Sequence, residues 1–293
     1  MKLKVALIGY GYWGKILSTY IHNSSELELL AIYSPSVECE GILTNDINEI
    51  ILNDKIDAAI IATPVHSHYE LAKSLLRHKK HVFCEKPLTY SLEEAQKLKA
   101  IAEDENLILE TNYLYLDSKS IQKGKEILST IDEVTFAELK ISQFGKVYPN
   151  EHVYSTIGSH LLSAAYYVFD EFNYESFFRH HIVTNEGYSA YGDIQLIGNN
   201  RKINIACNLV SHERTRQLVF HAEKDIVVID LLADETVIHY KVINDILEKH
   251  DSYSFDESNN IEYALQRFVD VILGSRKSNI NLSIAVTRTL DFN

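Results

Sequence analysis

The feature that most constrains this chain is a short apolar run that ends in three glycines. Residues 4–15 read KVALIGYGYWGK, with glycines at Gly9, Gly11 and Gly14. Glycine weakens strands and helices, and it suits positions where the backbone turns sharply or approaches another group closely. The chain has only 11 glycines among 293 residues, so three within six positions indicate one specialised turn.

The residues around this turn favour a strand before it and a helix after it, at Val5–Ile8 and Gly14–His22. In that setting the first glycine allows a tight turn, the second lets the backbone approach a pyrophosphate, and the third lets helix and strand pack closely. The phosphates would lie at the helix N-terminus, where N–H groups favour negative charge. The alternative is a glycine-rich turn without a ligand. We predict dinucleotide binding at the whole turn, which comprises Gly9, Tyr10, Gly11, Tyr12, Trp13 and Gly14.

Apolar runs and helical patterns alternate through the first part of the chain. Strands are predicted at Val5–Ile8, Leu29–Tyr33, Ala58–Ala62, His81–Cys84 and Leu107–Thr111, and helices at Gly14–His22, Ile47–Ile51, His68–Arg77 and Ser91–Glu105. Ser91 can cap the last of these helices. Such alternation predicts an α/β fold in which helices cover both faces of a parallel sheet.

The second part of the chain has a different pattern, with many short strands and few helices. Strands are predicted at Glu133–Phe144, Phe177–Val183, Tyr188–Ile197, Lys202–Val210, Gln217–Ala222, Ile226–Leu231 and Thr236–Val242, and helices at Ser159–Phe169 and Ile261–Leu273. Asn199-Asn200 and Glu223-Lys224-Asp225 are predicted hairpin turns. A mostly antiparallel open sheet with helices on one face is the simplest architecture. A chain of this length also suits two domains, for which we predict residues 1–115 and 116–293.

Composition argues against several classes of partner. Asp and Glu number 41 against 28 Lys and Arg, and the net charge of −13 disfavours nucleic acid and membrane surfaces. No apolar run approaches the roughly 18 residues of a membrane span, and the N-terminal run is a strand and not a signal peptide. The three cysteines, Cys39, Cys84 and Cys207, have no metal-site or disulfide spacing, which indicates reduced thiols and a cytoplasmic protein.

Specificity between NAD and NADP is expected at the end of the second strand. An acidic residue there would bind the ribose 2′-OH, and an arginine would bind a 2′-phosphate. The segment that contains Ser34 has neither, and Glu38 and Glu40 lie just beyond it. The choice of cofactor therefore stays open, with NAD slightly favoured.

Two further motifs follow predicted parallel strands, where open α/β sheets bind ligands. Residues 62–68 read ATPVHSH, and residues 84–88 read CEKPL. Together with the glycine turn, and with the later stretches RTRQLV at 214–219 and EKD at 223–225, they give the chain a strong resemblance to the Gfo/Idh/MocA oxidoreductase family. The resemblance extends over nearly the whole chain, and the Glu85-Lys86-Pro87 tripeptide is its most specific part.

The resemblance implies a doubly wound Rossmann domain followed by an α+β domain that binds substrate and forms homodimers or homotetramers through its open sheet. It implies hydride transfer between NAD or NADP and a hydroxyl or carbonyl carbon of a sugar, a cyclitol or a nucleotide sugar. The cofactor contacts that it implies beyond the glycine turn are Ser34, Thr63, Pro64, His66, His68, Glu85, Lys86 and Pro87. Lys86 matches the active-site lysine, and the peptide bond before Pro87 is expected to be cis. His66 and His68 could also suggest a metal, but no carboxylate or cysteine completes such a site, so none is predicted.

The second catalytic signature of the family is D-x-G-x-H on a helix, and here the matching stretch is Thr156-Ile157-Gly158-Ser159-His160. The aspartate is replaced by Thr156, which the spacing places on the same helical face as His160. His160 is the candidate general acid/base because a histidine pKa lies near working pH. Tyr115 and Thr156 are candidates for substrate contact, and Lys86 and His160 are candidates for both substrate contact and catalysis.

Each of these assignments has a plainer alternative. Lys86 could be a solvated surface lysine, His160 a helix-packing histidine, Tyr115 an interdomain contact, and Cys84 is expected to be a small buried filler. The loss of the aspartate also admits a dinucleotide-binding sensor or scaffold without catalysis. A third possibility is an NAD-assisted lyase or glycosidase without net redox change.

Overall fold

The computed structural model describes residues 2–35, 41–145, 147, 151–170, 173–184 and 186–291. They form two compact units, the first comprising residues 1–114 and 259–293 and the second comprising residues 115–258. The sequence placed residues 259–293 in the second domain, and the structure corrects this because the chain returns to complete the first unit. The 3₁₀ turn η2 (Leu114–Asp117) carries the chain from the first unit to the second.

The first unit is a six-stranded parallel sheet with the strand order β3-β2-β1-β4-β5-β6. This order, with its reversal between β1 and β4, confirms the predicted doubly wound Rossmann sheet. The elements of the unit are β1 (Leu3–Ile8), α1 (Tyr12–Asn23), β2 (Leu27–Tyr33), β3 (Leu43–Thr44), α2 (Asn48–Ile51), β4 (Ala58–Ile61), the 3₁₀ turn η1 (Val65–Ser67), α3 (His68–Arg77), β5 (His81–Glu85), α4 (Leu92–Asp104), β6 (Leu109–Asn112), α7 (Asn260–Ile272) and α8 (Ile280–Leu290).

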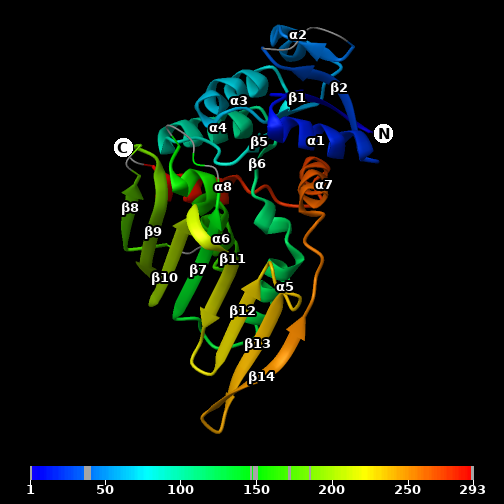
Figure 1. Ribbon diagram of the computed structural model, residues 1–293. Coiled ribbons are helices and arrows are strands. Elements are labelled where there is room, and N and C mark those ends of the chain that lie inside the picture. The colour runs from blue at the N-terminus through cyan, green and yellow to red at the C-terminus, as the bar shows by residue number, and fades with distance from the viewer. Residues whose placement is uncertain are drawn as a thin grey trace. The chain divides into compact units, whose positions relative to one another are not determined.

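Helices cover both faces of this sheet (Figure 1). On one face, α1 and α7 bury Leu17 and Phe268, and the Phe268 ring packs 5.2 Å from the ring of Phe83 on β5. On the other face, α3, α4 and α8 bury Leu75, Leu98 and Ile284. The central strands read as continuous apolar runs because they are buried from both sides.

A buried charge explains why the C-terminal helices belong to this unit. Glu110 on β6 is fully buried, is paired with Arg267 of α7, and accepts a hydrogen bond of 2.6 Å from the Asn279 backbone N–H. The side chain of Asn279 accepts from the Thr111 N–H and donates to the Thr111 carbonyl, at 3.0 and 2.7 Å. The segment before α8 therefore binds the outer edge of β6 much as another strand would.

We expect Arg267→Met to lower the free energy of unfolding of the first unit by about 3 kcal/mol, because Glu110 would keep a buried charge without its cation. Trp13 is the single tryptophan and lies in this unit, so its fluorescence in urea reports the effect. Arg276→Met, at an exposed position on the same segment, is the matched control and should change stability by less than about 0.5 kcal/mol. An equal loss of stability in both variants would contradict the ion-pair explanation. So would a double variant in which adding Glu110→Gln to Arg267→Met does not restore stability.

The second unit is an eight-stranded sheet with the order β14-β13-β12-β11-β7-β10-β9-β8, in which only the β7–β10 pair is parallel. This confirms the predicted mostly antiparallel sheet. Its elements are α5 (Lys119–Leu128), β7 (Phe136–Phe144), the π-helical turn η3 (Tyr154–Gly158), α6 (Ser159–Val168), β8 (Ser176–Val183), β9 (Ser189–Gly198), β10 (Arg201–Asn208), β11 (Val210–His221), β12 (Asp225–Asp230), β13 (Val237–Ile243) and β14 (Ile246–Tyr253).

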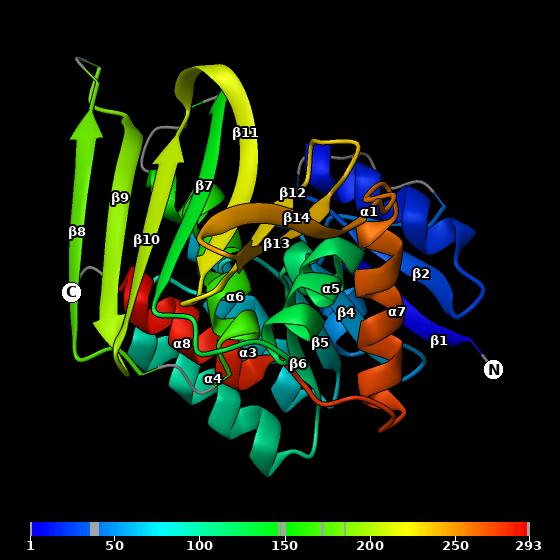
Figure 2. The same ribbon diagram turned by 90° about the horizontal axis from the view of Figure 1, so that it is seen from below.

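Figure 2 shows this sheet from a second direction, with α5 and α6 on one of its faces. Gly124 lets α5 approach the sheet closely, since a Cβ there would lie 2.3 Å from the Ile229 side chain. Asn199 and Asn200 have φ angles of 52° and 55°, which suit the tight hairpin predicted between β9 and β10. In the described part of the chain, no helix is both long enough and apolar enough to cross a bilayer.

Candidate functional site

The first and third glycines of the turn are required by the protein itself. Gly9 has φ of +102°, and a Cβ there would lie 2.5 Å from the carbonyl oxygen of Ala62. A Cβ on Gly14 would lie 2.1 Å from the carbonyl oxygen of Gly9. These contacts pack α1 against the ends of β1 and β4, as the spacing predicts.

The middle glycine has no such reason. Gly11 is exposed, has φ of −74°, and a Cβ at this position would meet no heavy atom within 4 Å. Neither backbone strain nor packing within the described residues therefore calls for glycine here. Glycine is favoured at a helix N-cap, and its lack of a side chain also leaves the backbone open to a ligand at this point.

The start of α1 is arranged to receive negative charge. Its first turn carries no acidic residue and its N-cap is Gly11, which has no side chain to bind the first N–H groups. In α4, by contrast, the Ser91 hydroxyl accepts a hydrogen bond from the Glu94 N–H, as predicted, and the first turn carries two glutamates. The open N–H groups and the dipole of α1 fit a pyrophosphate.

The aromatic residues of the turn have separate surroundings. Tyr12 is 83% exposed, while Tyr10 is half-buried with the Lys15 ammonium 5.7 Å from its ring centroid. The Trp13 indole N–H donates to the Glu85 carboxylate. Tyr12 is therefore accessible to a ligand through both its backbone and its ring, whereas the polar atom of Trp13 is used inside the protein.

The residues after β2 and β4 form the neighbouring part of the same sheet edge. Ser34 is buried, and its N–H donates to the Thr44 carbonyl at 3.0 Å. The Thr63 hydroxyl lies 2.7 Å from that of Ser67, and Pro64 and His66 are exposed. Glu38 and Glu40, which bear on the choice between NAD and NADP, lie outside the described residues.

His68 lies in a different environment from the one its motif suggests. It is fully buried, with Nδ1 3.0 Å from the Pro87 carbonyl oxygen and Nε2 2.9 Å from that of Thr63. Burial lowers the pKa of His68, although the carbonyl contacts oppose this. The side chain thus has no surface for a cofactor, and it positions the Thr63 and Pro87 loops relative to each other.

Glu85 connects three parts of the sheet edge. Its Oε1 accepts from Trp13 on α1 and, at 2.6 Å, from the side-chain amide of Asn112 on β6. Its Oε2 accepts from the backbone N–H of Lys86 at 3.3 Å. Burial raises the pKa of Glu85, and the bonds from Asn112 and Trp13 act in the opposite direction. Asn112 was not among the predicted site residues, because its partner lies 27 positions away.

The EKP tripeptide adopts the expected backbone. The Lys86–Pro87 peptide bond is cis, which confirms the prediction, and Lys86 is half-buried at the end of β5. Cys84, just before it, is buried in the apolar core, and burial raises the pKa of its thiol well above the usual value. Cys84 is therefore the inert filler that the sequence predicts.

In the second unit, the structure places three candidates around one helix start. Thr156 lies in the π-helical turn η3, and His160 in the first turn of α6. The ring of Tyr115 packs 5.2 Å from that of His160, at an interplanar angle of 32°. Tyr115 is 6% exposed, and burial raises its pKa to about 12, so it stays a neutral phenol that supports the imidazole.

Thr156 is engaged within its own helix. Its hydroxyl lies 3.0 Å from the Val153 carbonyl oxygen and 3.3 Å from that of His152. A π-turn inserts an extra residue into a helix, and such turns often occur at functional sites. The Thr156 hydroxyl thus contacts carbonyl oxygens at the start of its own helix.

One histidine near this helix was not predicted. The His152 ring is stacked on Tyr154 at 5.7 Å and contacts the edge of His181 at 4.4 Å. Burial, together with the charges of His181 and Arg179, lowers the pKa of His152. No local pattern links residue 152 to a strand almost 30 positions away, so this pair could not be predicted from the sequence.

Several known proteins are similar to this chain in sequence and in fold. Residues 3–113 match the GFO_IDH_MocA model, described as an oxidoreductase family with an NAD-binding Rossmann fold. The oxidoreductase YrbE of Bacillus subtilis is 25% identical over 210 residues, which are 66% of this chain and 61% of that protein. The scyllo-inositol 2-dehydrogenase (NADP(+)) IolU of B. subtilis is 29% identical over 119 residues, 36% of this chain and 35% of that protein.

A solved structure shows the same fold over nearly the full length. The UDP-N-acetylglucosamine 3-dehydrogenase GnnA of Acidithiobacillus ferrooxidans has a TM-score of 0.84 at 16% identity, covering 99% of this chain and 96% of its own. In sequence, the matches span between 26% and 61% of the length of three curated relatives.

Proposed function

We propose that this chain is a member of the Gfo/Idh/MocA oxidoreductase family and transfers a hydride between NAD or NADP and a hydroxyl or carbonyl carbon of a small molecule; the match of residues 3–113 to the family's Rossmann domain supports this. The observation that carries the proposal is Gly11, a glycine that the protein's own packing does not require, at the start of a helix with open N–H groups. The backbone from Gly9 to Gly14 would hold the pyrophosphate, and Ser34, Thr63, Pro64 and His66 would line the rest of the cofactor.

The bound dinucleotide would supply the acceptor or donor of the hydride. In the direction of oxidation, the His160 imidazole accepts the proton of the substrate hydroxyl. The Lys86 ammonium donates a hydrogen bond to the same oxygen and stabilises the charge that develops on it. Reduction reverses these roles. Tyr115 supports the His160 ring, and Glu85 with Pro87 fixes the backbone that carries Lys86.

For the substrate we propose a sugar, a cyclitol or a nucleotide sugar. This is supported by the names of two similar proteins, one acting on scyllo-inositol and one on UDP-N-acetylglucosamine. We further propose a cytoplasmic homodimer or homotetramer formed through the open sheet of the second unit. The net charge of −13 disfavours nucleic acid and membrane surfaces as partners.

Calorimetric titration with NAD⁺, NADH, NADP⁺ and NADPH is the first test, and absence of binding at millimolar cofactor would refute the proposal. The second test follows the absorbance of the reduced nicotinamide across a panel of sugars, cyclitols and nucleotide sugars. Binding without any absorbance change across the panel would favour a silent binder, and product formation without absorbance change would favour a lyase or glycosidase.

We expect Thr156→Asp to raise the apparent pKa of His160 by roughly one pH unit, because a nearby carboxylate favours imidazolium. An NMR titration of the His160 ring, assigned with His160→Asn, measures this. Thr156→Asn is the matched control, since it has the same shape without the charge. If both variants titrate like the wild type, the residue-156 side chain does not face His160.

A further inference from the structure

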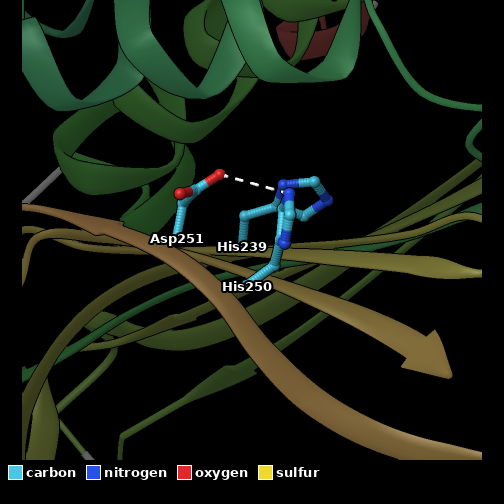
Figure 3. Close-up of side chains that lie close together, drawn as sticks. All are labelled: His239, His250 and Asp251. Atoms are coloured by element: carbon cyan, nitrogen blue, oxygen red, sulfur yellow. Dashed lines mark ion pairs between the residues drawn. The ribbon is translucent and has the colours of Figure 1, made fainter.

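Three side chains of metal-binding type converge at the outer edge of the second sheet, on strands that carry none of the proposed catalytic residues. His239 on β13 and His250 and Asp251 on β14 each offer a ligand atom, and these atoms lie within 4.8 Å of one another. Figure 3 shows a ring nitrogen of His239 turned toward His250 and Asp251. The dashed line marks the 3.5 Å between His250 Nε2 and Asp251 Oδ2.

A β-bulge brings the two β14 ligands together. Neighbouring residues of a regular strand point to opposite faces, so His250 and Asp251 would normally be separated. Here His239 pairs with Asp251 and Tyr240 pairs with Lys249, which leaves His250 as an extra residue in β14. Such an extra residue redirects side chains locally, and bulges are common at functional positions.

A buried carboxylate orients the innermost histidine. The Nε2 atom of His239 lies 2.7 Å from Asp225 Oδ1, and both residues are buried, at 5% and 7% exposure. An imidazole that donates from Nε2 keeps the lone pair of Nδ1 available. A carboxylate behind the outer nitrogen of a histidine is the usual support of a metal ligand.

From this arrangement we infer a binding site for a divalent transition-metal ion, with Zn²⁺ as the best-suited cation. His239, His250 and Asp251 supply two nitrogens and one oxygen, a ligand set that suits Zn²⁺ better than Mg²⁺ or Ca²⁺. Zn²⁺ bonds of about 2.0–2.1 Å place neighbouring tetrahedral ligands roughly 3.4 Å apart. The 3.5 Å between His250 and Asp251 matches that spacing, and the His239 ligand atom lies within 4.8 Å of both, so side-chain rotation must bring it closer when the ion binds.

The surroundings leave room for the ion and for one further ligand. The side chains of His250 and Asp251 are 44% and 50% exposed, so water can complete the coordination. Lys123 on α5 also interacts with Asp251, but its ammonium lies 2.8 Å from Glu126 and 4.6 Å from the ring centroid of Tyr253. Bound Zn²⁺ would link β13 to the edge strand β14 and stabilise the folded state by mass action.

The test titrates chelator-treated full-length protein with Zn²⁺ alone, in competition with a chromophoric chelator. We expect one Zn²⁺ per chain and at least about a 10-fold loss of affinity in His250→Ala and in Asp251→Asn. Asp225→Asn removes only the supporting carboxylate and should cost about 10–100-fold. The control is His212→Ala, since His212 is another exposed histidine with a carboxylate 3.6 Å away, on Glu213, and should have no effect.

Circular dichroism of each variant separates lost ligands from lost folding. The inference is overturned if wild-type affinity equals that of His250→Ala, or if His212→Ala weakens binding as much. Unchanged affinity in folded Asp225→Asn would overturn the role given to the supporting carboxylate. Because the readout is Zn²⁺ and not dinucleotide or turnover, the outcome is independent of the proposed oxidoreductase function.

Discussion

Gly11→Val is expected to abolish dinucleotide binding while the protein stays folded and nearly as stable as the wild type. The valine side chain would occupy the space beside the helix N-terminus, where the proposed site brings the pyrophosphate to the backbone. Among the described residues, a Cβ at this position has no heavy atom within 4 Å apart from its chain neighbours, and φ is −74°. Affinity should fall at least about 100-fold, or roughly 2.7 kcal/mol, and stability by no more than about 1 kcal/mol.

Calorimetry measures the binding, and Trp13 fluorescence in urea measures the stability. Gly14→Ala is the contrasting variant, because its Cβ would lie 2.1 Å from the Gly9 carbonyl oxygen. It should lower stability and binding together. A Gly11→Val protein that binds cofactor like the wild type would show that the phosphates lie elsewhere, and would remove the observation on which the proposed function rests.

The Rossmann sheet could be predicted because its strands are buried on both faces. Runs such as Val5–Ile8 and Ala58–Ile61 consist wholly of apolar residues, and the residues that end them are also the proposed site residues. The sequence signal for fold and site was therefore the same signal. In the second unit, alternation marked most strands, but β14 reads ILEKHDSY, is almost wholly exposed and has no apolar face to recognise.

The return of the C-terminal helices could not be predicted from local pattern. The helical periodicity at Ile261–Leu273 was recognised, but periodicity does not say which sheet a helix covers. That choice depends on Glu110 and Arg267, which are 157 positions apart, and on Asn279 at the edge of β6. Buried charges that find partners across such distances leave no periodic trace in the sequence.

The histidines likewise show that closeness in sequence does not predict which side chains meet in space. His66 and His68 were grouped because they are close in sequence, yet one is exposed and the other is held by carbonyl oxygens. The group formed by His239, His250 and Asp251 depends on a strand pairing and a bulge, neither of which a spacing rule contains. Residue types therefore suggest chemistry, but cross-strand register decides which of them meet.

Lys86→Ala is expected to separate cofactor binding from chemistry. Because the proposed cofactor site binds mainly through backbone N–H groups of the glycine turn, dinucleotide affinity should stay within a few-fold of wild type. The backbone bond from residue 86 to Glu85 Oε2 also survives the substitution, which leaves the Glu85 contacts to Trp13 and Asn112 in place. Turnover should fall by roughly 10²–10⁴, the scale of a lost charge-stabilising or proton-transfer group.

The measurement is kcat on the substrate that the panel identifies, alongside calorimetry with the preferred cofactor. Lys73→Ala is the matched control, a lysine of the same unit that pairs with Glu70 at 3.2 Å, and it should keep full activity. Lys86→Arg should recover little, because the guanidinium keeps the charge but places it differently. Full turnover in Lys86→Ala would show that this lysine is a solvated side chain, and would leave His160 to carry the chemistry without a second group on the reacting oxygen.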